Sequence, residues 1–388
     1  MLQSANTKVR KRKAERSVIV GNSSQKPQQA KKVKFKRSPK ASVHSPLPIP
    51  QKAVASTSSS EGADSDQDSA EAVEPPSLLE GQIFSVLRAC GESTYGTVYL
   101  VQSNTDHKLY ASKVFKTKPT SQMPSSFSGE VKVLKQISRR GFHPNIVHYY
   151  GAEITCRLEV RMMIEFCNGG DLHDQTARFR ETNMRAPRQF ALHAFIQCCE
   201  SLAWLHHGLR HDGTNGYVVD DNFTEGTIHG DIKPENILLN RERRDIMPRL
   251  VICDFSHGSL ASQPRSHVGT PMFFSPEARA IYHGKPIPGQ PISTKHDCYA
   301  MGLTLYSLLW DAYWPVGRHP RSLRVPPEHQ DLGLERLLCA MLQPKPSARP
   351  DMNDRPGNML GGILELRALR YEMYEREGLL DKKLWKTV

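Results

Sequence analysis

The sequence predicts an α+β protein of two lobes, a small β-rich lobe followed by a larger and mainly helical one, behind a disordered N-terminal tail. Between about Phe84 and Phe166, short apolar runs alternate with polar residues, as in half-buried strands. After Gly169 and Gly170, apolar residues recur every three or four positions, as on buried helix faces. Before residue 78, Ser, Lys, Gln, Pro and Ala dominate and aromatic residues are few. These changes of pattern give the order of tail, β-rich lobe and helical lobe.

The tail, residues 1–77, divides into a basic part and an acidic part. Residues 1–55 hold fourteen Lys or Arg and one acidic residue, whereas residues 56–76 hold six acidic residues and no basic one. So little apolar surface cannot offset the entropy lost on ordering, and we expect disorder. The clusters Lys8–Arg16 and Lys31–Arg37 resemble nuclear import signals, which favours binding to an import receptor. A solvated tail that binds polyanions without specificity is the open alternative.

Cysteine content and hydropathy limit the cellular compartments that are expected for this protein. The eight Cys include no CxxC pair, and the N-terminus has no apolar stretch like the core of a signal peptide. We therefore expect a reduced intracellular compartment, nucleus or cytoplasm, with the basic clusters favouring the nucleus. No run of about 18 apolar residues occurs, so we expect no membrane span.

The β-rich lobe is expected to hold five strands and one helix. The helix is predicted near residues 127–137, between the third and fourth strands. The predicted strands are Phe84–Ala89, Thr97–Val101, Leu109–Phe115, Ile146–Tyr150 and Val160–Phe166.

The helical lobe is expected to contain at least three long helices. Residues 189–207 place apolar side chains at three-to-four spacing, which predicts one buried helical face. Residues 297–309 are more uniformly apolar and predict a second helix, and residues 334–342 predict a third. No internal repeat is visible.

Two neighbouring segments, HGDIKPEN and CDFS, carry the residue types that phosphoryl transfer needs. In the first, Asp231 can orient a hydroxyl nucleophile and accept its proton, and Lys233 adds positive charge where a phosphoryl group passes. Asn236 and, in the second segment, Asp254 offer hard oxygen ligands for magnesium. An Asp before an apolar strand is by itself most often a cap or turn residue, so the prediction depends on the four residues together.

These two segments resemble the catalytic loop and the metal-binding strand of the eukaryotic protein kinase family, serine/threonine type. The resemblance covers about residues 82–375 and implies the bilobal protein kinase fold. Its N-lobe would comprise residues 78–167 and its C-lobe residues 168–378, with a short C-terminal tail at 379–388. The family implies ATP and Mg²⁺ as cofactors and a protein with a Ser or Thr acceptor as substrate. Lys233 and the later Thr270 match the serine/threonine type.

The segment CGESTYGTV lies between two predicted strands and resembles the glycine-rich loop that covers the ATP phosphates. Gly91 and Gly96 match two of its glycines, which let the backbone approach a phosphate. Ser93 stands where the family usually has another Gly. A Gly-bounded hairpin turn would be the alternative if this segment stood alone.

The resemblance assigns further nucleotide contacts to both lobes. Lys113 would bind the α and β phosphates and pair with Glu130, and Asp171 would lie near the ribose. The residues expected around the adenine are Val98, Ala111 and Leu238 on its two faces, with backbone groups of Glu165 and Cys167 at its edge.

The segment Thr270–Glu277 resembles the substrate-binding end of a kinase activation segment. Glu277 and Arg349 match a structural ion pair of the helical lobe, and Asp297 matches a buried helix residue that braces the catalytic loop. These three residues are expected to support the site rather than to react, and losing one partner of a buried pair would be costly.

Two positions depart from the family pattern. Gly230 replaces an Arg that, in kinases carrying it, binds a phosphorylated residue of the activation segment. We therefore expect no such switch and no need for the Ser residues of that segment. Ser256 replaces the Gly after Asp254 and Phe255, which should restrict backbone rotation there.

Three other functions remain as alternatives. A pseudokinase or scaffold would bind nucleotide or partners without efficient catalysis, but it should have lost a phosphate or metal ligand, and all are present. The triplet HGD also occurs in small-molecule kinases of the aminoglycoside and choline type, which generally lack Lys233 and the Thr270–Glu277 segment. A protein that chiefly binds nucleic acid through its tail would show salt-steep binding that disappears without residues 1–55.

The stretch between His207 and Thr227 is longer than the family's usual connection before the catalytic loop. Its Gly, Asn and Asp content predicts an exposed loop insertion. His206, His207 and His211 could indicate a metal site. Because no Cys accompanies them and no HxxxH spacing is expected on one helix, a solvated loop is the favoured interpretation.

Overall fold

A computed structural model describes residues 82–92, 96–115, 125–154, 160–214, 216–242, 247–263, 269–355 and 357–385. The predictions for the tail, for Ser93 and for Ser266 lie outside these residues. In the described part of the chain, no helix combines the length and the apolar character needed to cross a membrane.

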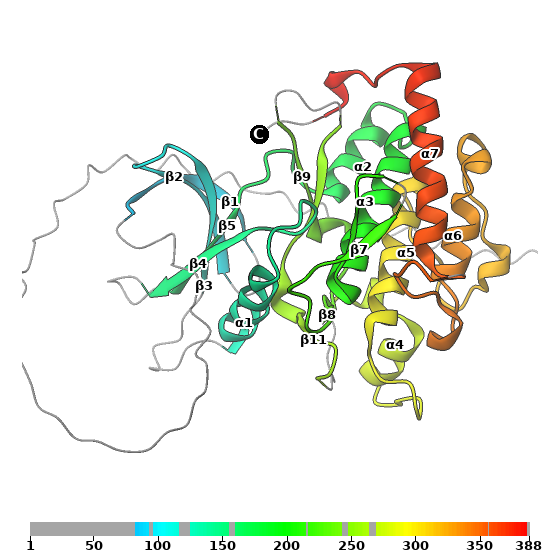
Figure 1. Ribbon diagram of the computed structural model, residues 1–388, viewed down its shortest axis with the longest axis horizontal. Coiled ribbons are helices and arrows are strands. Elements are labelled where there is room, and N and C mark those ends of the chain that lie inside the picture. Colours follow the sequence, from blue (N-terminus) through cyan, green and yellow to red (C-terminus); the bar gives the residue numbers. More distant parts are fainter. Residues whose placement is uncertain are drawn as a thin grey trace, which may run out of the picture. The chain divides into compact units, whose positions relative to one another are not determined.

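The first lobe is built on one antiparallel five-stranded sheet, as the alternating pattern predicts (Figure 1). The order of strands is β1-β2-β3-β5-β4. Their bounds are β1 Phe84–Glu92, β2 Gly96–Ser103, β3 Leu109–Phe115, β4 Tyr149–Ile154 and β5 Val160–Glu165. Helix α1, Ser125–Arg139, packs on the sheet through Phe127, whose ring lies 5.0 Å from that of Phe115 on β3.

The fourth strand begins later than predicted. The sequence indicates a strand from Ile146, but Ile146 and Val147 pair instead with Ile252 of the other lobe, through a bridge and a 2.9 Å backbone hydrogen bond. Both residues are apolar and buried. Hydrophobic periodicity in the sequence indicates that such a short apolar run is buried, but it does not indicate which lobe buries it.

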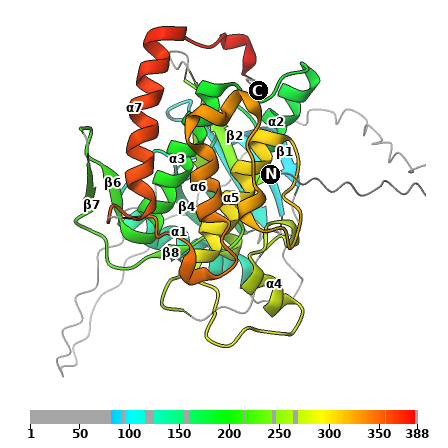
Figure 2. The ribbon, with the colours of Figure 1, turned by 90° about the vertical axis from the view of Figure 1, so that its right-hand side faces the viewer.

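The second lobe is mainly helical and surrounds a core centred on α3 (Figures 1 and 2). α3 is buried on almost every side, because it contacts α5, α7 and three short strands. It ends at Gly208, whose positive φ of 68° suits glycine. The helices are α2 Leu172–Glu181, α3 Arg188–His207, α4 Pro276–Tyr282, α5 Thr294–Trp310, α6 Leu334–Met341 and α7 Met359–Glu377.

Short strand pairs and single turns of 3₁₀-helix hold the loops between these helices. The strand pairs are β6 Leu209–His211 with β7 Tyr217–Val219, β8 Thr227–Ile228 with β11 Ser259–Leu260, and β9 Ile237–Asn240 with β10 Arg249–Ile252. The 3₁₀ turns are η1 Pro234–Asn236, η2 Phe255–His257, η3 Pro271–Phe273, η4 Pro320–Ser322, η5 Pro327–Leu332, η6 Pro346–Ala348 and η7 Lys382–Leu384.

The predicted exposed loop after α3 is instead a packed hairpin, β6–β7, visible at the side of the helical lobe in Figure 2. Leu209 is buried, and Tyr217 donates a 2.9 Å hydrogen bond to Glu200 of α3. Glu200 also pairs with Arg367 of α7. Glycine and asparagine content correctly predicts an exposed turn, but it does not reveal that Leu209 before the turn is buried or that Tyr217 after it contacts α3.

The chain that leaves the hairpin holds the end of α1. The guanidinium of Arg140 lies between two rings, 4.2 Å from Trp204 and 4.8 Å from Phe223. It also donates to the Leu205 carbonyl at 3.1 Å. Asp220 accepts hydrogen bonds from Trp204 and, at 3.0 Å, from Arg210. Burial lowers the pKa of Arg140 to about 10, which still leaves it charged at neutral pH.

Candidate functional site

A buried lysine joins the two lobes. Lys113 of β3 is 5% exposed, and its Nζ lies 2.8 Å from Glu130 Oε2 on α1 and 3.0 Å from Asp254 Oδ1 after β10. Residues 17 and 141 positions away in sequence thus meet on one ammonium group. We call Lys113, Glu130 and Asp254 the lysine cluster.

The two carboxylates of the lysine cluster experience different environments. Burial raises the pKa of Glu130 to about 7, against the attraction of Lys113. Burial also opposes ionisation of Asp254, but the charge of Lys113 and hydrogen bonds from Lys113 and Ser256 outweigh it, so the pKa of Asp254 is lowered. Asp254 therefore remains an anion beside the ammonium group.

One face of the sheet carries Lys113 together with apolar side chains. The register pairs Val98 with Lys113 and Ala111 with Ile164, and residues directly opposite in an antiparallel pair share a face. Val98, Ala111 and Ile164 therefore lie on the side of Lys113. Only Gly fits at residue 96, because a Cβ there would lie 2.1 Å from the Val114 carbonyl oxygen, whereas Gly91 has open space.

The connection between the lobes carries the residues predicted at the adenine edge. The Glu165 amide already donates to the His148 carbonyl at 2.8 Å, and its side chain accepts from Asn240 at 2.9 Å. Among the described residues, no backbone hydrogen bond involves Cys167. Leu238 packs from β9 against the core of the helical lobe.

The second cluster lies on the helical lobe, at the turn after β8. Asp231 Oδ2 lies 2.8 Å from Lys233 Nζ, which also donates to Thr270 Oγ1 at 2.8 Å. The Thr270 amide donates to Asp231 Oδ1 at 2.7 Å. A Cβ on Gly269 would lie 2.0 Å from the Asp231 carboxyl, so this approach requires glycine. Burial opposes ionisation of Asp231, yet hydrogen bonds from Lys233 and Thr270 lower its pKa.

Asn236 connects the two clusters. Its Nδ2 donates to the Asp231 carbonyl at 2.8 Å, and its backbone carbonyl accepts from the Cys253 amide at 3.0 Å. Cys253 immediately precedes Asp254, which takes a strained φ of 61°. Because the amide nitrogen of Asn236 is occupied, its side-chain oxygen remains to act as a ligand. Together with the Asp254 carboxylate, it gives the oxygen donors that a hard divalent cation prefers.

A buried carboxylate of α5 supports the turn that carries Asp231. Asp297 of α5 accepts hydrogen bonds from the His229 amide at 2.7 Å and the Gly230 amide at 2.9 Å. Its third partner is His206 Nε2 at 3.1 Å. Burial opposes ionisation, but His206 and the other bonds lower the pKa of Asp297 to about 2. Gly230 has a φ of 77°, where a side chain would be strained.

The position of His206 corrects the prediction of a solvated histidine loop. His206 and His207 belong to the last turn of α3, and His206 is buried against Asp297. His229 is also fully buried, and its Nε2 lies 2.8 Å from the Cys253 carbonyl. The predicted pair of Glu277 with Arg349 is present as a buried bidentate contact at 2.6 and 2.7 Å.

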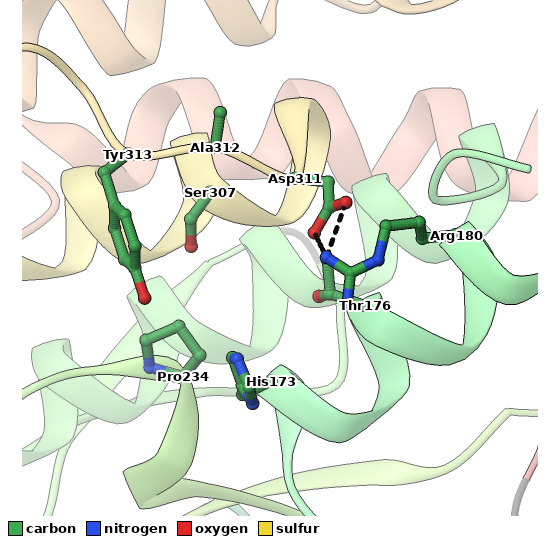
Figure 3. Close-up of a pocket in the computed structure, with 8 residues that line it drawn as sticks. All are labelled: His173, Thr176, Arg180, Pro234, Ser307, Asp311, Ala312 and Tyr313. Atoms are coloured by element: carbon green, nitrogen blue, oxygen red, sulfur yellow. Dashed lines mark hydrogen bonds and ion pairs between the residues drawn. The ribbon is translucent and has the colours of Figure 1, made fainter. Parts of the chain in front are cut away.

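A small pocket of about 160 Å³ opens beside Pro234, next to this turn (Figure 3). In Figure 3, Arg180 and Asp311 lie together at one end of it, joined by two hydrogen bonds of 3.0 Å. Tyr313 and His173 line the remaining walls. We call it the Pro234 pocket. Asp171, predicted near the ribose, caps α2 by accepting from the Asp174 amide at 2.7 Å.

The architecture and these contacts agree with a comparison to known families. A family model described as the protein kinase domain matches residues 84–354. The chain belongs to the protein kinase family. As a family, protein kinase domains use ATP and a divalent metal ion, and they act on proteins.

Several curated kinases resemble this kinase domain at moderate identity. The G2-specific protein kinase fin1 of Schizosaccharomyces pombe is 29% identical over 58% of this chain and 30% of its own length. CBL-interacting serine/threonine-protein kinase 2 of Arabidopsis thaliana is 27% identical over 71% and 55%, and the serine/threonine-protein kinase Nek2 of Mus musculus is 26% identical over 72% and 59%. The chain thus spans about a third to three fifths of the length of these relatives.

The structure adds residues that the sequence did not single out as members of the site. The sequence places Thr270 in the substrate-binding segment and links it to the serine/threonine type, but it does not indicate that Thr270 contacts both Asp231 and Lys233. Gly269 and Ile164 were not assigned any role. Ile164 could have been found from strand register, because it lies opposite Ala111. No local pattern would have identified the contact of Gly269 with Asp231.

Proposed function

We propose that this protein is an ATP-dependent serine/threonine kinase, a transferase that moves the γ-phosphoryl group of ATP to a hydroxyl group of a protein. The observation that carries the proposal is the lysine cluster, because it requires both lobes to adopt the arrangement that phosphate binding needs. The kinase domain would comprise an N-lobe at 78–167 and a C-lobe at 168–378, followed by a short tail at 379–388.

We assign nucleotide binding to residues of both lobes. Lys113 would hold the α and β phosphates, with Glu130 fixing its position. The adenine would lie between the apolar face of the sheet and Leu238, with the Glu165 carbonyl and the Cys167 backbone at its edge. The phosphates would be covered by the segment of Gly91, Ser93 and Gly96.

Asn236 and Asp254 would hold the divalent cation, which we propose is Mg²⁺, since both offer hard oxygen donors. When bound, the cation would neutralise charge on the phosphates. Asp231 would orient the acceptor hydroxyl and accept its proton as the new bond forms between the acceptor oxygen and the γ phosphorus. The bond between the γ phosphorus and its bridging oxygen breaks, and ADP leaves. Lys233 would balance the negative charge of the transferred group.

Two observations favour this proposal over its alternatives. All the charged groups expected of an active kinase are present and correctly paired, which a pseudokinase or scaffold does not require. The segment Gly269–Glu277 reaches from Asp231 to the buried pair with Arg349, and thus offers a fixed edge along which an extended peptide could lie. A small-molecule kinase has no need of such an edge.

We also propose a cellular location for the protein and a binding function for its tail. The basic clusters support a location in the nucleus, with the cytoplasm as the alternative, and binding to an import receptor or to polyanions would follow from them. A membrane partner is not expected.

The decisive experiment measures transfer from radiolabelled ATP to mixed Ser, Thr and Tyr peptides. Wild-type protein should label Ser and Thr peptides, and Asp231→Ala should lower turnover by about 10²- to 10⁴-fold, as expected for loss of a general base. Asp212→Ala, on the exposed turn of the β6–β7 hairpin, serves as the matched control and should keep wild-type turnover. If the wild type labels no peptide or generic protein while Asp254→Ala binds nucleotide unchanged, the scaffold function replaces this proposal.

A further inference from the structure

A groove of about 660 Å³ lies on the helical lobe, directly after the segment that contacts Asp231. Its walls come from η3 and α4 on one side and from α5 and the chain after it on the other. We call it the Met272 groove. The residues used below are Met272, Phe274, Arg279, Lys285, Trp314 and Val316.

The Met272 groove has an uncompensated positive charge. Arg279 and Lys285 line it, and the Arg318 guanidinium lies 5.5 Å from the ring of Trp314. Within the described ranges, none of these three cations forms an ion pair. The Arg279 guanidinium donates to the Pro271 carbonyl, at 3.1 Å. The nearby Glu277 is buried and fully engaged by Arg349.

The groove also presents apolar side chains to solvent. Met272 is 52% exposed and Val316 is 71% exposed, and the buried rings of Phe274 and Trp314 line the same groove. Large apolar side chains that gather at a groove mark an interaction site more often than singly exposed ones do. Apolar walls with free cations suit a protein segment that carries an apolar anchor and acidic side chains.

The position of the groove relates it to the proposed acceptor site. The Thr270 amide bonds to Asp231, and Met272 follows two residues later, at most about 7 Å along an extended chain. An acceptor protein with its hydroxyl at Asp231 would therefore place residues about two to five positions away in the groove, since a strand advances roughly 3.3 Å per residue.

The Pro234 pocket, which neighbours the Met272 groove, differs from it in charge (Figure 3). Its cation, Arg180, already forms two hydrogen bonds to Asp311, so it attracts an incoming acid much less. Tyr313 lines this pocket and the adjacent Trp314 lines the Met272 groove, so one short segment separates the two. Selection for acidic residues should therefore act where the acceptor chain enters the Met272 groove, and not where it passes the Pro234 pocket.

We propose that the Met272 groove selects acceptor proteins that carry an apolar residue and acidic residues two to five positions from the Ser or Thr, on one side of it. This inference rests on the proposed kinase function and adds a substrate class to it. The charge contrast between the Met272 groove and the Pro234 pocket carries it.

The test uses the full chain and four synthetic peptides with one central Ser. Two peptides place Leu and three Glu on one side or the other of the Ser, and two replace the Glu residues by Lys. On one side only, the Glu peptide should exceed its Lys counterpart by at least about five-fold in kcat/KM, because two or three exposed ion pairs act together. The preference should shrink at high salt.

Charge reversal in the groove should remove this selection. In Lys285→Glu, and more so in Lys285→Glu combined with Arg318→Glu, the Glu-to-Lys ratio should fall to about one or invert. Lys345→Glu makes the same charge change at an exposed lysine of the same lobe that does not line the groove, and it should keep the wild-type ratio. Unchanged melting temperatures establish that the variants are folded.

Binding of the fluorescein-labelled Glu peptide, followed by anisotropy, tests the groove without catalysis. Tighter binding to wild type than to Lys285→Glu supports the inference even if no transfer occurs, in which case only the proposed function fails. Equal kcat/KM for Glu and Lys peptides on both sides would overturn the inference and leave the kinase function standing. The same holds if Lys285→Glu keeps the wild-type preference.

Discussion

The two walls of the proposed nucleotide site differ in how firmly they are held. β1, which leads into the glycine-containing segment, is exposed along almost its whole length and pairs with β2 alone. The turn that carries Asp231 is buried, with Asp297 bonded to two of its amides and His229 packed within the core. Stability is distributed unevenly in proteins, and elements with few buried contacts open most readily. The groups proposed for chemistry are thus held in place by buried contacts. β1 should open more readily, which would let nucleotide enter and leave the proposed site.

The largest effect in this comparison is expected from removing the Lys113 ammonium group, which joins the two walls through Glu130 and Asp254. Lys113→Met should reduce kcat/KM by at least about 10²- to 10³-fold, because phosphate binding and the positioning of Asp254 are lost together. Steady-state assays with varied ATP would measure it. Lys108→Met, at an exposed lysine just before β3, is the matched control and should stay within a few-fold of wild type. Equal losses in both variants would contradict the assigned role.

Removing the Asp297 carboxylate, which supports the turn that carries Asp231, should lower the stability of the protein. Asp297→Asn replaces a carboxylate that accepts three hydrogen bonds by an amide that presents an N–H to one of the donors. We expect the free energy of unfolding to fall by about 3–5 kcal/mol, as for a broken buried charge pair. Urea unfolding measures it, with the exposed Asp212→Asn as the control.

The same variant also has a pH signature. The pKa of Asp297 is lowered to about 2 in the folded state, so its stabilisation is present above pH 4 and is lost as pH falls towards 2. The stability difference between wild type and Asp297→Asn should therefore narrow over that range. A difference that stays constant would show that ionisation of Asp297 does not contribute.

A smaller effect tests how the helical lobe is anchored behind the site. His193 of α3 lies 2.9 Å from the Pro248 carbonyl and 3.0 Å from Arg370 of α7, and burial beside Arg370 lowers its pKa to about 4. The unfolded chain therefore binds more protons between pH 6.5 and 4, and stability should fall by roughly 2–3 kcal/mol as pH drops through that range. In His193→Gln the fall in stability should be smaller by this amount, with the remainder due to other histidines such as His143 and His207, whose pKa values are lowered by burial to about 3 and about 4. The exposed His319→Gln should retain the full wild-type slope.

The smallest effect is expected in the activation segment. Gly230 offers no cation to a phosphorylated residue, and the backbone there is already held by Asp297. Replacing Ser256, Ser259, Ser262 and Ser266 together by Ala should keep turnover within a few-fold of wild type. Radiolabel transfer before and after phosphatase treatment measures this, and a near-total loss in the variant would show that modification is required.

The sequence predicted the two lobes, and it suggested most residues of the proposed site, because their pattern is local. HGDIKPEN and CDFS each lie within a few residues, and alternation identifies exposed strands. It could not predict contacts set by packing between distant segments. Ile146 is apolar in either lobe, His206 gains its role only from Asp297 on another helix, and the closeness of Gly269 to Asp231 depends on the path of the whole activation segment.

The contacts of Arg140 with the rings of Trp204 and Phe223 affect how the two lobes can move. The helix that carries Glu130 is anchored at its end to the helical lobe, although it packs on the sheet of the other lobe. A rotation of the sheet away from the helical lobe would therefore shear Lys113 past Glu130 rather than carry both together. We therefore expect the distance between these two side chains to change as the two lobes open and close. A pair of spectroscopic labels on β3 and α1 would measure this change.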